Sequence, residues 1–166
     1  MLEIPDDSGF LALIVPGMYA SFVAETWDFE LLRSHFRRQM ARHSMLIWGT
    51  GLEGMWRVDV QVDGPDVRGF REVVGPLHVE GRSVLVTSYD SLTMAAQFPD
   101  VSLPQAHERD QLVPLPDGDY ICRVVQLFDP NACESAGGES RDFVIILRAS
   151  TRPVQKWSEI PWCSVP

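Results

Sequence analysis

The sequence is poor in cysteine and in long hydrophobic runs. Its three cysteines, Cys122, Cys133 and Cys163, show no CxxC spacing, which argues against a disulfide framework and suits a reducing compartment. The apolar stretch Phe10–Val15 is cut by a Pro-Gly pair and is too short to cross a bilayer. The N-terminus has neither a basic segment nor the hydrophobic run of a cleavable signal. We therefore expect a soluble, cytoplasmic protein with no membrane partner.

Basic residues are scarce as well. The chain has 14 lysines and arginines against 23 acidic residues, a net charge of −9. Proteins bind the phosphates of nucleic acid through lysine and arginine, so we expect no direct nucleic-acid partner. A basic protein partner is compatible with this charge, and the alternative is a charge that only keeps the protein soluble.

Signatures of catalysis and of metal binding are absent. The histidines are scattered: His35, His43, His78 and His107. No HExxH, GxSxG, P-loop or GxGxxG motif is present. Asp117-Gly118-Asp119 resembles a piece of a calcium loop but lacks the spaced ligands and the closing glutamate. We expect no metal, no cofactor and no enzyme activity. The remaining catalytic hypotheses are a pairing of Cys133 with His107 and a hydrolase with its site in the loop Asp90–Asp110.

The composition is that of a globular protein. Its 166 residues are 45% hydrophobic and 10% aromatic, enough to bury a self-sufficient core. We expect residues 1–166 to form a single domain.

The clearest architectural signal is the stretch Leu112–Pro130. Asp117-Gly118 is typical of a turn, and Tyr120–Phe128 carries apolar side chains on both faces. Such a run predicts a strand that is covered from both sides and therefore lies centrally in its sheet. Asp129-Pro130 ends it, because proline lacks the donor that a strand ladder needs.

Other short strands are predicted along the chain. Trp56–Val62 alternates apolar and polar residues, which predicts a strand with one face in the core. Turn residues separate the remaining apolar runs, of which the last is apolar on both faces. These runs are Phe10–Val15, Met18–Ala24, Met45–Trp48, Phe70–Val74, Leu77–Val79, Val84–Tyr89 and Phe143–Ala149.

One amphipathic helix is predicted over residues 28–44. Its apolar residues recur every three or four positions, as Phe29, Leu32, Phe36 and Met40. Its arginines fit either a solvated helix face or an anion-binding contact. Several short strands with a single helix and no βαβ alternation predict a mainly β protein, an antiparallel two-layer β-sandwich of jelly-roll-like form. A small barrel is the second choice.

Residues 90–113 form the least regular segment, and a long loop in a compact domain is often functional. Acidic residues concentrate here and around the strand that follows. Residues 89–142 hold ten acidic against three basic side chains, which is −7 of the total charge of −9.

The sequence resembles the competence protein J family, inhibitors of a DNA-entry nuclease, and related β-sandwich immunity proteins of bacteria. The likeness runs from about Phe10 to Phe128 and is carried by the order of elements, by the strand pair Pro76–Val86 and by the LPDGDY turn at Leu115–Tyr120. The chain departs from the pattern in the insertion Asp90–Asp110 and in a tail that carries two tryptophans.

The resemblance implies a non-enzymatic inhibitor or immunity protein that occludes a basic toxin or nuclease. An acidic face would speed the encounter with a basic partner and imitate phosphate charge. The candidate partner-binding residues are Phe98, Asp100, His107, Glu108, Asp110, Asp117 and Asp119. Solvated loop carboxylates are the alternative interpretation of each acid.

A different class of function also fits the sequence, namely a β-sandwich module that binds a small molecule or carbohydrate. Tryptophans would serve as its stacking platforms: Trp48, Trp56 and the pair Trp157 and Trp162 of the tail. This hypothesis requires an open apolar pocket with convergent polar groups.

Overall fold

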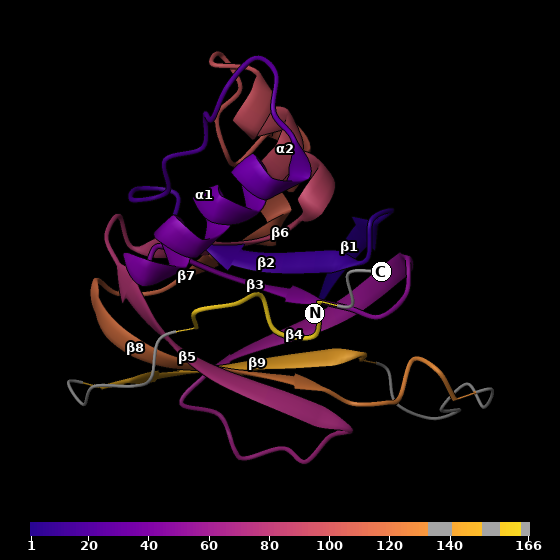
Figure 1. Cartoon of the computed structure of the whole chain (residues 1–166). Coiled ribbons are helices and arrows are strands. Elements are labelled where there is room, and N and C mark those ends of the chain that lie inside the picture. The colour runs from indigo at the N-terminus through magenta and orange to yellow at the C-terminus, as the bar shows by residue number, and fades with distance from the viewer. Residues whose placement is uncertain (133–140, 151–156, 164–166) are drawn as a thin grey trace.

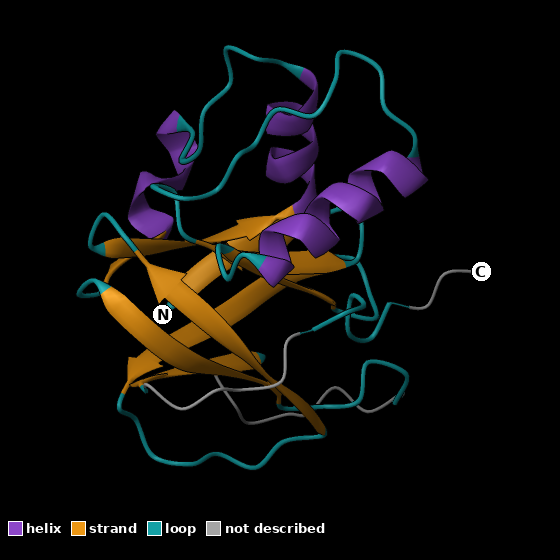
Figure 2. Ribbon diagram, turned by 60° about the vertical axis from the view of Figure 1, so that its left-hand side comes forward, coloured by secondary structure: helices purple, strands orange, loops and turns teal. Residues whose placement is uncertain are grey.

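The computed structural model of the chain describes residues 1–132, 141–150 and 157–163. Two β-sheets stack face to face, and helices cover the outer face of one of them (Figures 1 and 2). The larger sheet has the strand order β1 (Leu2–Asp6), β4 (Gly54–Val62), β9 (Phe143–Ala149), β8 (Gly118–Gln126) and β5 (Arg71–Val79). The smaller has the order β3 (Met45–Gly49), β2 (Phe10–Ile14), β6 (Ser83–Ser88) and β7 (Leu112–Pro114).

The main core fills the space between the sheets. Trp56 and Val58 of β4 point into it, as the alternating pattern predicts, and Trp48 of β3 and Phe143 of β9 meet them there. The other face of the smaller sheet holds a second core beneath the helices. The molecule therefore has three layers, two of sheet and one of helix (Figure 1).

The predicted helix is confirmed as α1 (Phe29–Ala41). Asp28 caps it by accepting a hydrogen bond from the N–H of Leu31 at 2.8 Å. The prediction of a single helix is wrong, because α2 (Tyr89–Gln97) and a 3₁₀ helix, η1 (Ala106–Gln111), occupy much of the segment that lacked a clear periodicity. Leu92 and Ala96 of α2 are buried against the smaller sheet.

A mainly β fold with two packed sheets is confirmed, with a correction to its topology. β4 and β9 pair in parallel, so the larger sheet is mixed rather than antiparallel. The strand orders do not show a jelly roll. The strand expected at Met18–Ala24 is an irregular segment, since Val23 and Ala24 donate their N–H groups to the carbonyl of Ala96 in α2 rather than to a neighbouring strand.

β5 is one continuous strand where two short ones were expected. Pro76 lies in its middle, and a proline is tolerated because β5 is at the edge of its sheet. β8 lies next to it, so the central strand of the sheet is β9. The outer face of β8 is partly covered by the segment 63–70, where Arg123 donates to the carbonyl of Val67 at 2.9 Å.

The described part of the C-terminal tail, residues 157–163, lies along an open side of the sandwich. The indole of Trp157 donates to the carbonyl of Val74 in β5 at 2.7 Å. The carbonyl of Pro161 accepts from Gly49 in β3 at 2.9 Å, so the tail bridges the edges of both sheets. None of the helices in the described residues is long and apolar enough to cross a membrane.

Candidate partner-binding surfaces

The seven predicted binding residues do not converge on one patch. They occupy three places: the segment after α2 (Phe98, Asp100), the helix η1 (His107, Glu108, Asp110) and the turn that leads into β8 (Asp117, Asp119). His107 and Asp110 are exposed on η1.

Glu108 is not a surface carboxylate, and its prediction as a partner-binding residue is corrected. Only 1% of it is exposed. Its Oε1 accepts from the hydroxyl of Thr87 in β6, and its Oε2 accepts from the N–H of Gln105 at 2.8 Å. With Gln105 it forms a capping box at the start of η1, so its contribution is to hold that helix on the sheet.

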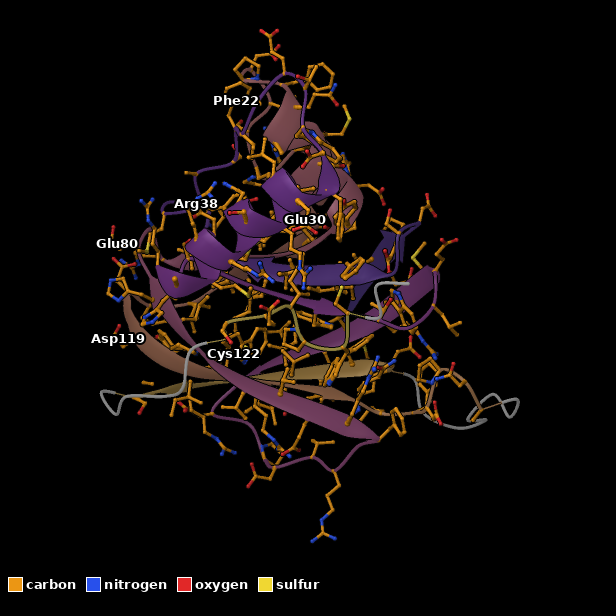
Figure 3. All side chains as sticks on the ribbon, in the orientation of Figure 1. Phe22, Glu30, Arg38, Glu80, Asp119 and Cys122 are labelled. Carbon is orange, nitrogen blue, oxygen red and sulfur yellow. The ribbon has the colours of Figure 1, made fainter. Side chains whose placement is uncertain are left out.

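Carboxylates gather at one end of the sandwich, a group that we call the carboxylate end and that consists of Asp63, Glu80, Asp117 and Asp119. The pairing of β5 with β8 places His78 opposite Asp119. His78 Nδ1 lies 2.6 Å from Asp119 and its Nε2 3.5 Å from Glu80 (Figure 3). Asp117 accepts from the N–H of Arg82 at 2.8 Å, which joins the turn before β8 to the turn between β5 and β6.

The negative charge at this end raises the pKa values of neighbouring groups. The hydrogen bond to Asp119 raises the pKa of His78, and the charges of Asp119 and Glu80 act in the same direction. Burial raises the pKa of the Tyr120 phenol, to which the charges of Asp63 and Asp117 add. Sequence reasoning missed Asp63 and Glu80, because only the strand pairing brings their turns together.

Apolar side chains are exposed at the far tip of the helix layer. We call them the tip patch: Phe22, Met94 and Phe98, which are 45%, 46% and 40% exposed. The hydrogen bonds from Val23 and Ala24 to Ala96 hold Phe22 beside the last turn of α2, at the top of Figure 3.

The two chain segments that carry the tip patch hold charge of only one sign. Glu25 and Asp100 are exposed there, and the segments 16–28 and 93–105 contain no lysine or arginine. Of the predicted residues, Phe98 and Asp100 thus belong to this surface. No sequence pattern points to Phe22, which lies more than 70 positions from them and is placed by the backbone hydrogen bonds of its neighbours.

The arginines of α1 do not form a free anion-binding face. Arg33 donates to Glu159 of the tail at 2.9 Å, and Arg37 binds the same carboxylate oxygen. Arg38 donates to Ser34 at 2.9 Å. The helix thus uses at least part of its positive charge to hold the C-terminal tail.

The described residues show no metal cluster and no reactive thiol at Cys122. They contain no group of three or more His, Cys, Asp or Glu side chains able to hold a metal ion. Burial raises the pKa of the Cys122 thiol, so this cysteine is not an activated nucleophile. Cys133, the predicted partner of His107, lies outside the described residues.

The tryptophans proposed as stacking platforms are mostly unavailable. Trp48 is 0% exposed and Trp56 5%, so neither can meet a ligand, and the prediction for both is wrong. Trp157 packs against Gly75 of β5. Trp162 borders a concave surface, a cleft of about 460 Å³ between the turn after β1 and the turn after β3.

Comparison with known proteins places the fold. The sequence matches no known family profile and no curated protein. Among solved structures, crocagin biosynthetic gene J is similar with a TM-score of 0.56 and 14% identity, over 89% of this chain and 94% of that one. ComJ from Bacillus subtilis, inhibitor of the DNA degrading activity of NucA, is similar with a TM-score of 0.54 and 9% identity, over 90% of this chain and 94% of that one.

Both matches extend over almost the whole chain, so they concern the complete two-sheet architecture and not a shared hairpin. At these identities they establish the fold alone. The chain therefore shares its fold with ComJ and with crocagin biosynthetic gene J, and the predicted resemblance to the competence protein J family is confirmed at the level of the fold.

Proposed function

We propose that this chain is a non-enzymatic inhibitor that binds a basic nuclease or toxin and covers its working surface. The observation that carries the proposal is the tip patch, where Phe22, Met94 and Phe98 are exposed and the neighbouring charged side chains are acidic. Large apolar side chains within an acidic rim fit a partner that presents an apolar pocket among lysines and arginines.

The energetics of protein interfaces favour this arrangement. A few central aromatic side chains contribute most of the binding free energy, and a polar rim keeps water away from them. Rim charges contribute more to the rate of encounter and to the choice of partner. Glu25 and Asp100 are placed to act as rim charges, while the net charge of −9 and the carboxylate end attract a basic protein from a distance.

The fold supports the same proposal. ComJ, which shares this architecture, is an inhibitor of the DNA degrading activity of a nuclease. Crocagin biosynthetic gene J shares this architecture but is named for biosynthesis and not for inhibition. Because one fold can serve different functions, the proposed role of inhibitor rests on the surface of this chain as well as on its fold.

An inhibition assay tests the function. The purified chain is added to each DNA-degrading nuclease of the source organism, and the cleavage of duplex DNA is measured at low and high salt. We expect one nuclease to be inhibited at a molar ratio of about one to one, more weakly as salt screens the charges. If none is inhibited, or if inhibition does not depend on salt, an electrostatically guided inhibitor is ruled out.

The tip patch makes a sharper prediction. Phe98→Ala should weaken binding of the inhibited nuclease by about tenfold or more, the loss typical of an aromatic anchor. Phe70→Ala is the matched control, because Phe70 is 49% exposed and belongs to the segment on the outer face of the larger sheet. Calorimetric titration measures both affinities. Equal affinities of the two variants would place the interface elsewhere.

A further inference from the structure

The cleft beside Trp162 lies far from the carboxylate end. Arg71, which contacts Trp162, starts β5, whereas His78 is near the end of that strand. The cleft is lined by Ser8, Gly9, Phe10, Gly49, Gly51, Leu52, Glu53 and Trp162. Its volume of about 460 Å³ is in the range of small-molecule sites. Neither the tip patch nor the carboxylate end uses it.

The walls of the cleft are held in place before any ligand arrives. The guanidinium of Arg71 lies 4.4 Å from the centre of the Trp162 ring and covers one face of it. The same guanidinium donates to the carbonyls of Gly49 and Thr50 at 3.3 and 3.1 Å. Gln126 also donates to the carbonyl of Thr50, at 2.9 Å. These bonds hold the indole and the turn after β3 in place before a ligand binds. Less conformational entropy is therefore lost on binding.

Three of the residues that line the cleft have positive φ angles, in the left-handed region of backbone conformation. Gly9 and Gly51 have φ of +75° and +91°, which glycine adopts without strain, and a Cβ at Gly51 would meet the ring of Pro130 at 2.6 Å. Trp162 has φ of 57°, which is strained for a bulky residue. Strain of this kind persists where the surroundings hold a residue in place, and it clusters at binding sites. The held indole is therefore the candidate contact surface.

The charges around the cleft select the ligand. Glu53 is the charged residue among those that line it, and it is exposed. An anion would be repelled by this carboxylate. A cation on the indole would face the positive charge of Arg71 behind the ring. A neutral ligand that donates hydrogen bonds meets neither penalty.

We propose that this cleft binds a neutral, hydroxyl-rich ring, the chemistry of a sugar. The apolar face of the ring packs on Trp162. A ring hydroxyl donates to the carboxylate of Glu53, which gives a charge-assisted hydrogen bond. Ser8 donates its own hydroxyl to Asp90 at 3.0 Å, so its oxygen stays oriented to accept from a second hydroxyl of the ligand. This site is independent of the proposed inhibitory function.

Fluorine NMR of the chain labelled with fluorotryptophan tests the proposal, because each of the five tryptophans gives its own signal. The probes are glucose, galactose, mannose and N-acetylglucosamine, with choline as the cation and glucose 6-phosphate as the anion. We expect at least one neutral sugar to shift the Trp162 signal saturably while choline does not. Glu53→Gln should weaken that binding by about tenfold, and Glu3→Gln, a substitution of an exposed glutamate in β1 that does not line the cleft, should leave it unchanged.

The same spectra would also reveal the outcomes that contradict the proposed sugar site. If none of the four sugars shifts the Trp162 signal, or if choline shifts it as strongly as they do, the proposal is wrong. Binding that is equally strong in Glu53→Gln would also overturn it. Both glutamates are exposed, so loss of folding does not complicate the comparison.

Discussion

At the scale of single residues, the pKa values of two histidines are shifted in opposite directions, each by an identifiable cause. His35 in α1 is 5% exposed, and burial, with help from the charge of Arg38, lowers its pKa to about 4. His78 lies between Asp119 and Glu80 at the carboxylate end, and its pKa is raised. His35 therefore stays neutral inside the helix layer until the pH approaches 4, while His78 takes up a proton more readily than a free imidazole.

The lowered pKa of His35 predicts a loss of stability in mild acid. As the pH falls below 6.5, the imidazole takes up a proton in the unfolded chain but not in the folded one, until the pH reaches about 4. The free energy of unfolding should fall over this range by as much as about 3 kcal/mol. In His35→Gln this part of the pH dependence should be missing. Urea unfolding at a series of pH values measures it, and identical slopes for both proteins would show that His35 is protonated when folded.

At the scale of elements, one buried carboxylate joins β1 to its neighbours. Asp6 ends β1 and is 0% exposed. Its Oδ1 accepts from the N–H groups of Ser8 and Phe10, both at 3.1 Å, and so shapes the turn into β2. Its Oδ2 accepts from the hydroxyl of Thr50 at 3.0 Å and from the indole of Trp56 at 3.1 Å. This carboxylate thus ties strands of both sheets to the wall of the cleft.

Asp6→Ala should therefore be strongly destabilising. It removes the acceptor of the buried Trp56 indole and of the N–H groups of Ser8 and Phe10, and we expect the free energy of unfolding to fall by about 3 kcal/mol or more. Asp7→Ala is the control, because Asp7 is exposed and its loss should cost about 0.5 kcal/mol or less. Chemical denaturation of both variants gives the comparison, and a cost for Asp6→Ala as small as that for Asp7→Ala would contradict this role.

The elements themselves were largely predictable, but their pairing was not. The alternation of Trp56–Val62 and the capped stripe of α1 each express one buried face, which a sequence displays directly. α2 was not identified as a helix, because its stretch is short and its exposed Met94 interrupts a clean apolar stripe. The parallel pairing of β4 with β9 joins residues about 85 positions apart, and no local pattern encodes such a contact.

At the scale of the whole molecule, the sequence indicated an acidic binding protein but could not locate its surface. Phe98 and Asp100 were identified correctly as exposed, whereas Glu108 was taken for a surface acid. The charge pattern of a sequence does not distinguish a solvated carboxylate from one that caps a helix. The carboxylate end and the tip patch each combine segments that only the fold brings together.

In the proposed function, the acidic surface guides a basic nuclease to the chain by electrostatic attraction. The variant Glu80→Gln/Asp117→Asn/Asp119→Asn removes three negative charges from the carboxylate end. The control Glu3→Gln/Glu30→Gln/Glu53→Gln removes three from exposed positions elsewhere. Both triple variants remove three carboxylate charges. A difference between them therefore reflects the position of the charges and not their number.

The most direct test is the association rate of each variant with the inhibited nuclease, measured by stopped flow at low and at high salt. We predict that the loss of the carboxylate end slows association several-fold more than the control does at low salt, and that the difference disappears when salt screens the charges. Equal rates for the two variants at low salt would contradict the claim that this end of the molecule guides the partner.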